Sequence, residues 1–159
     1  MIVVKNEPTS NVELESIMNK YYIQCNGIFM KDELHDLEIG NYIINLNSSY
    51  ERGSHWVCLI CTAKEHIYFD SFGAPPPQDI HELLISKYGK VCFNSFIIQD
   101  LKSQLCGFFC LGLFLYIKLN SRKFASLVSK ANDFCNLFHE STVKNNTILK
   151  KFLKTHMKY

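Results

Sequence analysis

A cysteine at position 106 stands where a polar stretch of the chain meets its longest apolar run. The run from Leu105 to Ile117 is too long for an ordinary strand and too short to cross a bilayer, so we expect a buried helix. Cys106 would then lie at the helix N-terminus, where free backbone N–H groups and the helix dipole favour a thiolate over a thiol. Such a thiolate is a candidate nucleophile, which needs a base, a group that orients the base and an oxyanion hole.

Other polar residues could supply these roles. A neutral His55 imidazole beside Cys106 would take the thiol proton or hold the thiolate as an ion pair. A carboxylate from Asp70 would fix the tautomer of the ring and stabilise the imidazolium. The side-chain amide of Gln99, together with the backbone N–H of Cys106, could stabilise the oxyanion of a tetrahedral intermediate. Gly107 leaves space for a substrate backbone to approach the thiol.

Each of these residues also has a structural explanation when it is taken alone. A single histidine is more often structural than catalytic, Asp70 could simply end a strand, and Gln99 could be a surface amide. Cys106 could be a core thiol, although it is the one residue for which the functional explanation is favoured on its own. The combination supplies every role that a thiol hydrolase needs, and it therefore favours catalysis.

A predicted hairpin brings two of the candidates to one end of a sheet. Strands are expected from His55 to Cys61 and from His66 to Asp70, and their short connection predicts antiparallel pairing. A turn centred near Thr62-Ala63 would place His55 opposite Asp70, with about 5 Å between their Cβ atoms. Because the turn contains no glycine, a shift of the register by one or two residues stays open.

The rest of the chain alternates helical and extended patterns. Further helices are expected from Ser10, with Glu13 completing a capping box, from Asp79 to Lys87, from Ser121 to about His139 with Phe124 on its apolar side, and from Thr142 to His156. Strands are expected from Tyr42 to Leu46 and from Val91 to Ile98, with a loop and a short helical turn between Ile28 and Leu37. This pattern predicts one α+β domain over residues 1–159, with a central sheet, a buried helix and flanking helices.

The cysteines argue for a reducing compartment. Seven cysteines at irregular spacing, without a signal peptide, are unlike a secreted disulfide scaffold, so we expect reduced thiols in the cytosol or nucleus. Cys58 and Cys61 form a C-x-x-C pair, but residues three apart on one strand point to opposite faces. No second pair accompanies them, so core packing is favoured over a metal site.

The charge is unevenly distributed although the net charge is only +2. Residues 1–40 hold seven acidic and three basic residues, and residues 142–159 hold five lysines and no acidic residue. A basic tail can bind nucleic acid or an acidic partner, but a solvated face of the last helix explains these lysines better.

Three segments in order resemble adenain, the maturation protease of adenoviruses, and still more its relatives in virophages and Maverick/Polinton elements. These segments are Gly53 to Val57, Tyr68 to Gly73, and Gln99 followed seven residues later by Cys106 to Cys110. The order His, acid, Gln, Cys is also that of the wider clan of SUMO and ubiquitin-like proteases. The resemblance covers roughly residues 10–120, and it implies a circularly permuted papain-like α+β fold.

The resemblance assigns the site residues one by one. It implies His55 as base, Asp70 as its orienter in place of the glutamate of adenain, Gln99 and the Cys106 N–H as oxyanion hole, and Cys106 as nucleophile. Trp56 would border the site and contact substrate. Gln104 is too close to the nucleophile to match the family's glutamine, and we reject it.

Adenain is stimulated by a disulfide-linked peptide and by DNA, so the resemblance also implies that an activator is to be considered. Cys92 lies on a comparable strand, but its spacing to Gln99 differs, and we treat it as a core thiol. The lysines that could contact DNA are Lys150, Lys151, Lys154 and Lys158. No cofactor, metal or membrane partner is expected.

The resemblance implies a cysteine endopeptidase that cleaves capsid or scaffold precursors at Gly-containing sites during virion maturation, in the virion and the host nucleus or cytoplasm. An isopeptidase that removes SUMO-like or ubiquitin-like proteins is the alternative within the enzymes. A catalytically inactive module that binds Gly-rich peptides is the alternative outside them.

Overall fold

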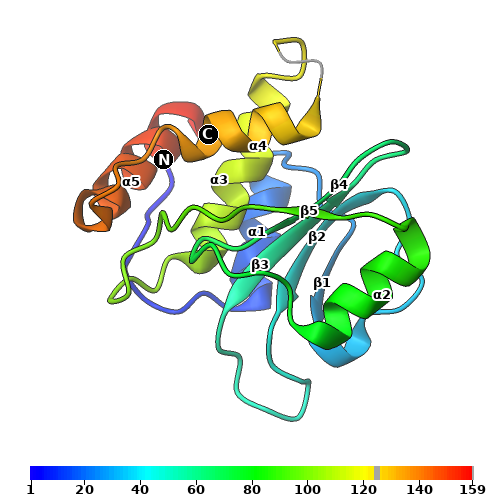
Figure 1. Ribbon diagram of the computed structural model, residues 1–159. Helices are drawn as coiled ribbons and strands as arrows, with labels where there is room; N and C mark the ends of the chain where they lie inside the picture. Colours follow the sequence, from blue (N-terminus) through cyan, green and yellow to red (C-terminus); the bar gives the residue numbers. More distant parts are fainter. Residues whose placement is uncertain (124–125, 159) are drawn as a thin grey trace.

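The computed structural model describes residues 1–123 and 126–158. Its centre is a mixed sheet of five strands in the order β1-β2-β3-β4-β5 (Figure 1). The strands are β1 Gly27–Met30, β2 Gly40–Asn45, β3 Trp56–Cys61, β4 His66–Phe69 and β5 Cys92–Phe93. The β1–β2 and β4–β5 pairs are parallel, whereas the β2–β3 and β3–β4 pairs are antiparallel.

Helices cover both faces of this sheet (Figure 1). The described residues form α1 Asn11–Lys20, α2 Gln78–Tyr88, α3 Cys106–Leu119, α4 Leu127–Cys135 and α5 Asn145–His156, with short 3-10 helices at Lys31–Glu33 and Thr142–Lys144. Helices α1, α3, α4 and α5 share the larger core cluster with one face of the sheet, and α2 packs on the other face. This arrangement confirms the expected α+β fold with a buried helix and flanking helices.

Strand β3 lies at the centre of both cores, and all six of its residues are buried. Cys58 and Ile60 belong to the cluster that contains α3, whereas Val57, Leu59 and Cys61 belong to the cluster that contains α2. The prediction that Cys58 and Cys61 point to opposite faces is confirmed. Because both faces are covered by helices, the strand is apolar throughout instead of alternating with polar residues.

Helix α3 is the buried helix that the apolar run predicted, and it begins at Cys106 as expected. Every residue from Cys106 to Tyr116 is buried, since β3, α1, α4 and α5 all pack against it. A fully enclosed side chain such as Phe109 contributes about 1.5–3 kcal/mol relative to an exposed one. Core packing therefore fixes the position of α3 independently of the contacts made by the site residues.

The β3–β4 hairpin forms, but its register differs from the expected one by two residues. Cys61 pairs with His66 and Cys58 with Phe69, so His55 and Asp70 lie beyond the paired residues and are not opposite each other in this register. The connection spans residues 62–65 and is closed by the Thr62 hydroxyl, which accepts hydrogen bonds from the backbone N–H groups of residues 64 and 65. This side-chain closure allows a longer turn without glycine.

Two other expectations for the sheet are wrong in part. The segment from Ile28 to Leu37, expected as a loop with a helical turn, contains strand β1, which pairs in parallel with β2 and is followed by the 3-10 turn. The strand expected from Val91 to Ile98 is reduced to the two residues of β5. The remainder of that segment leaves the sheet and runs towards the start of α3.

Among the helices, α1 has the predicted Ser10–Glu13 capping box, α2 lies within one residue of its expected bounds, and α5 begins three residues later than expected. The helix expected from Ser121 begins instead at Leu127 and is capped by Ser126. Glu65 of the hairpin turn accepts hydrogen bonds from the N–H groups of Leu127, at 2.7 Å, and of residue 128, which fixes that start. Phe124, expected on the apolar side of this helix, lies outside the described residues.

Candidate active site

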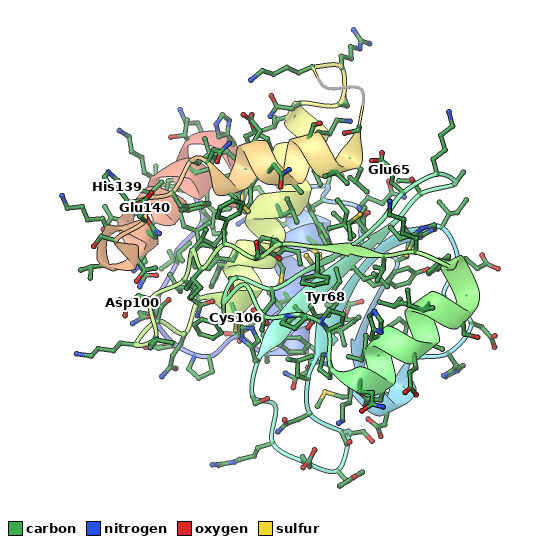
Figure 2. The ribbon with its side chains drawn as sticks, in the orientation of Figure 1. Glu65, Tyr68, Asp100, Cys106, His139 and Glu140 are labelled. Atoms are coloured by element: carbon green, nitrogen blue, oxygen red, sulfur yellow. The ribbon has the colours of Figure 1, made fainter. Side chains whose placement is uncertain are left out.

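The four candidate residues come from the ends of different elements. Cys106 is the first residue of α3, at the end of the helix that meets the sheet (Figure 2). His55 directly precedes β3, Asp70 directly follows β4, and Gln99 lies between β5 and α3. His55, Gln99 and Cys106 line one groove with a volume of about 720 Å³, and Asp70 lies behind His55.

The imidazole of His55 is held by two contacts. Its Nε2 atom lies 2.7 Å from Oδ1 of Asp70, and its ring stacks on the ring of Phe72 with 4.8 Å between the centroids. Asp70 is only 2% exposed, and its Oδ1 also accepts a hydrogen bond from the Phe72 N–H at 2.8 Å. Because Nε2 is engaged by the carboxylate, Nδ1 is the nitrogen that remains for Cys106.

This environment changes the protonation of the ring. Burial lowers the pKa of His55. The hydrogen bond with Asp70 and the interaction with Cys106 raise it by more than burial lowers it, and the resulting pKa is about 9. The ring is therefore an imidazolium at neutral pH. A cation in this position favours the thiolate form of a neighbouring cysteine.

Cys106 is 8% exposed, and its sulfur accepts a hydrogen bond from the Trp56 backbone N–H at 3.4 Å. The backbone N–H of Cys106 is among the first in α3, which have no carbonyl partner within the helix. The nucleophile and a free main-chain donor thus lie together at the wall of the groove.

Gln99 is 1% exposed, and its side-chain amide has a fixed orientation. Its Oε1 accepts a hydrogen bond from Ser71 Oγ at 2.5 Å, and its Nε2 donates to the carbonyl of Ser103 at 2.8 Å. A carbonyl only accepts, so the amide nitrogen must be the atom on the Ser103 side. One N–H of that nitrogen is then left to donate at the groove that Gln99 lines.

Two residues that sequence reasoning missed position the site. The side chain of Asn94 brackets the backbone of Asp70, accepting from its N–H at 2.9 Å and donating to its carbonyl at 2.6 Å. Ser71 holds the backbone N–H of Gln99 with its carbonyl, at 3.0 Å, besides the bond from its hydroxyl. Asn94 lies 24 residues from its partner, and no local sequence signal marks such a contact.

Trp56 lies at the groove wall where the sequence placed it. Its indole Nε1 donates to the carbonyl of Thr9 at 2.7 Å, and the N-terminal segment is thereby fixed as the neighbouring wall. The backbone N–H of Gln104 donates to Asn6 Oδ1 at 2.9 Å, which ties the same segment to the residues preceding the nucleophile.

Gly107 has a packing reason for being glycine. A Cβ atom at this position would lie 3.0 Å from Cδ2 of Leu14 and 3.4 Å from Cδ1 of Trp56. The residue is buried between α1 and the indole, and it is not among the residues that line the groove. These contacts explain why the residue is a glycine. The role predicted for Gly107, to leave space for a substrate backbone, stays a prediction.

The structure contains other features that bear on cofactors and activators. All seven cysteines are free thiols, and Cys92 is half-buried against the larger core cluster. In the described part of the chain, no group of three or more His, Cys, Asp or Glu side chains is placed to hold a metal ion. Over the same residues, no helix has both the length and the apolar character needed to cross a membrane.

No protein-family model matches the sequence, and no curated protein matches it. The solved structure of the ASFV pS273R protease aligns with a TM-score of 0.54 and 14% identity, over 98% of this chain and 68% of that one. The chain has the fold of a viral protease. The selenomethionine form of pS273R aligns with a TM-score of 0.45 and 12% identity, over 98% of this chain and 69% of that one.

Proposed function

We propose that the chain is a cysteine endopeptidase that processes viral capsid or scaffold precursors. The observation that carries this proposal is the 2.7 Å contact between His55 and Asp70 behind a groove that also contains Cys106 at a helix N-terminus. The shared fold with pS273R, a viral protease, supports the same class of reaction. A groove of about 720 Å³ is large enough for several residues of a polypeptide.

In the first half of the reaction, the Cys106 thiolate attacks the carbonyl carbon of the scissile peptide bond and forms a C–S bond. The resulting oxyanion receives hydrogen bonds from the Cys106 N–H and from Gln99 Nε2. Protonated His55 then gives its Nδ1 proton to the leaving amine, the C–N bond breaks, and a thioester and a free amine result. Asp70 remains ionised and holds the ring in position.

In the second half, neutral His55 takes a proton from water through Nδ1 while the water oxygen attacks the thioester carbon. The same oxyanion donors stabilise the second tetrahedral intermediate. Its collapse breaks the C–S bond, releases the carboxylic acid, and leaves the thiolate beside the imidazolium. The ion pair that began the cycle is restored.

We infer Gly-containing cleavage sites with small residues near the scissile bond. Trp56 and Phe72 both line the groove beside His55, and two aromatic walls favour thin residues there. Such a protease would act in the virion and inside the host cell, in the nucleus or cytoplasm.

The test is cleavage of the co-expressed capsid precursor by the wild type, Cys106→Ala and Cys92→Ala. Cleavage by the wild type and Cys92→Ala but not by Cys106→Ala is expected, and labelling of Cys106 by an electrophilic peptide probe should accompany it. Equal cleavage by all three proteins would overturn the Cys106 mechanism. Absence of both cleavage and labelling would favour an inactive peptide-binding module, and cleavage of a ubiquitin-like fusion alone would favour an isopeptidase.

A further inference from the structure

A buried amide lies in the groove beside the candidate catalytic residues. Asn45 is the last residue of β2, it is 2% exposed, and it lines the same groove as His55 and Cys106. The sheet register pairs Asn45 with Trp56, whose backbone N–H reaches the Cys106 sulfur. Paired residues on neighbouring strands have Cα atoms about 4.5–5.5 Å apart, so this amide lies one strand away from the reacting atom.

The orientation of the Asn45 amide is determined by its neighbours. Its Oδ1 atom accepts hydrogen bonds from the backbone N–H of Asn47, at 3.0 Å, and of Ser54, at 3.2 Å. Both partners can only donate, so the oxygen is assigned and the amide nitrogen must point the other way. Within residues 1–123 and 126–158, Nδ2 has no hydrogen-bond acceptor.

Among the described residues, Asn45 Nδ2 is not one of the buried side-chain atoms that lack a partner, so this nitrogen keeps contact with solvent although the residue as a whole is buried. Gly53 explains this access. A Cβ atom at Gly53 would lie 2.9 Å from Asn45 Nδ2, and Gly53 itself lines the groove. The missing side chain therefore leaves the donor open towards the space that a substrate would occupy.

We propose that Asn45 Nδ2 donates a hydrogen bond to a main-chain carbonyl of the substrate, on the leaving-group side of the scissile bond. The inference rests on the proposed protease function. The side follows from His55, which must stand next to the leaving amine in order to protonate it. Ser54 directly precedes His55 and donates to Asn45, so the amide lies on the His55 side of the sulfur.

This assignment selects a class of substrate. A peptide leaving group presents a main-chain carbonyl every 3.3 Å or so along an extended chain. An isopeptide leaving group is a lysine side chain, which offers no carbonyl near the scissile bond. Asn45 therefore favours endopeptidase cleavage over removal of a conjugated protein, whatever side chains the substrate carries.

The test uses two substrates with the same acyl half, selected beforehand from a quenched peptide library with a central Gly-Gly. One substrate ends in aminomethylcoumarin, and the other continues for three residues beyond the scissile bond. Asn45→Asp keeps the acceptor for the N–H groups of residues 47 and 54, but it replaces the donor by a carboxylate oxygen and adds a negative charge. Gly53→Ala places a methyl group 2.9 Å from Nδ2, so the Asn45 amide must shift or be covered, while its chemistry is kept.

Both variants should raise KM for the extended peptide about 3- to 10-fold, the value of one hydrogen bond. For the coumarin substrate, which lacks the residues beyond the scissile bond, kcat/KM should change less than for the extended peptide, so the ratio of the two values should fall about 3- to 10-fold in both variants. Equal losses on the two substrates, or none on either, would overturn the role of Asn45 while leaving the protease proposal intact. A wild type that cleaves neither substrate and is not labelled at Cys106 would contradict the protease proposal and the inference together.

Discussion

The Nε2 atom of His55 lies 2.7 Å from Oδ1 of Asp70, although the two residues are not opposite each other in the β3–β4 hairpin. Phe72 lies beyond the paired residues of the hairpin; its ring stacks on the imidazole, and its N–H donates to the same carboxylate oxygen. The carboxylate thus reaches the ring diagonally from a position just beyond β4. The contact between His55 and Asp70 therefore depends on how the chain turns after Phe69. Asn94 holds this turn by accepting a hydrogen bond from the backbone N–H of Asp70.

Replacing Asp70 by Asn should narrow the pH range of activity. The carboxylate raises the pKa of His55, which is about 9, so its loss lowers the pKa and the imidazolium deprotonates at a lower pH. The upper limb of the pH profile of kcat/KM is expected near 9 in the wild type and at a lower pH in Asp70→Asn. Asp79→Asn, an exposed change on α2, should leave the profile unchanged. An upper limb that does not move in Asp70→Asn would exclude His55 as the titrating group.

The same proton should make folding stability depend on pH. The pKa of His55 is raised from its ordinary value of 6.5 to about 9 in the folded protein, so the folded state binds this proton more tightly than the unfolded state. The stabilisation is fully present below about 6.5 and is lost as the pH rises through about 9. Urea unfolding of the wild type should show a fall in the unfolding free energy over this window that is smaller in His55→Gln. Equal pH dependence in both proteins would contradict the assignment.

Substitution of Asn94 should impair catalysis although Asn94 does not contact the substrate. Asn94→Ala removes the two bonds to the Asp70 backbone and frees the carboxylate to move away from the ring. A displacement of about 1 Å at such a group can cost about 100-fold in rate, so kcat should fall by about 10- to 100-fold with little change in KM. The pKa seen in the upper limb should fall as well, which a purely structural loss would not produce. Asn132→Ala, on the exposed face of α4, serves as the control.

The lysines of α5 offer a test of nucleic-acid activation. Lys150, Lys151, Lys154 and Lys158 line one surface hollow of about 400 Å³. If DNA binds there, Lys151→Glu with Lys154→Glu should weaken binding to a labelled duplex and reduce the slope of log affinity against log salt concentration by about 2. Lys64→Glu, in the hairpin turn, is the control. Unchanged affinity and slope in the double variant would place any DNA site elsewhere.

The parts of the site that could be predicted from sequence are those with local signals. The apolar run located α3 and placed Cys106 at its start, and the Ser10–Glu13 spacing located α1. Gln99 and His55 were found because their residue types and order fit a chemistry, and the structure brings both to the groove.

The parts that failed depend on contacts between distant segments. The register was missed because the Thr62 hydroxyl closes a turn that residue propensities do not mark. The start of α4 was missed because Ser121 and Ser126 are equally good caps, and a carboxylate from Glu65, 62 residues away, decides between them. Asn45 gives no signal at all, since an asparagine near a strand end usually indicates only a turn.

The link between Glu65 and α4 has a consequence for the opposite end of the hairpin. Figure 2 shows Glu65 at the turn near the start of α4, and the open end of the same hairpin carries His55 and Asp70. A slip of one residue between the strands would break bonds at both extremities at once. The register is thus fixed by contacts at both ends of the hairpin, whereas the residues between them, which are buried on both faces of β3, contribute packing to the two cores.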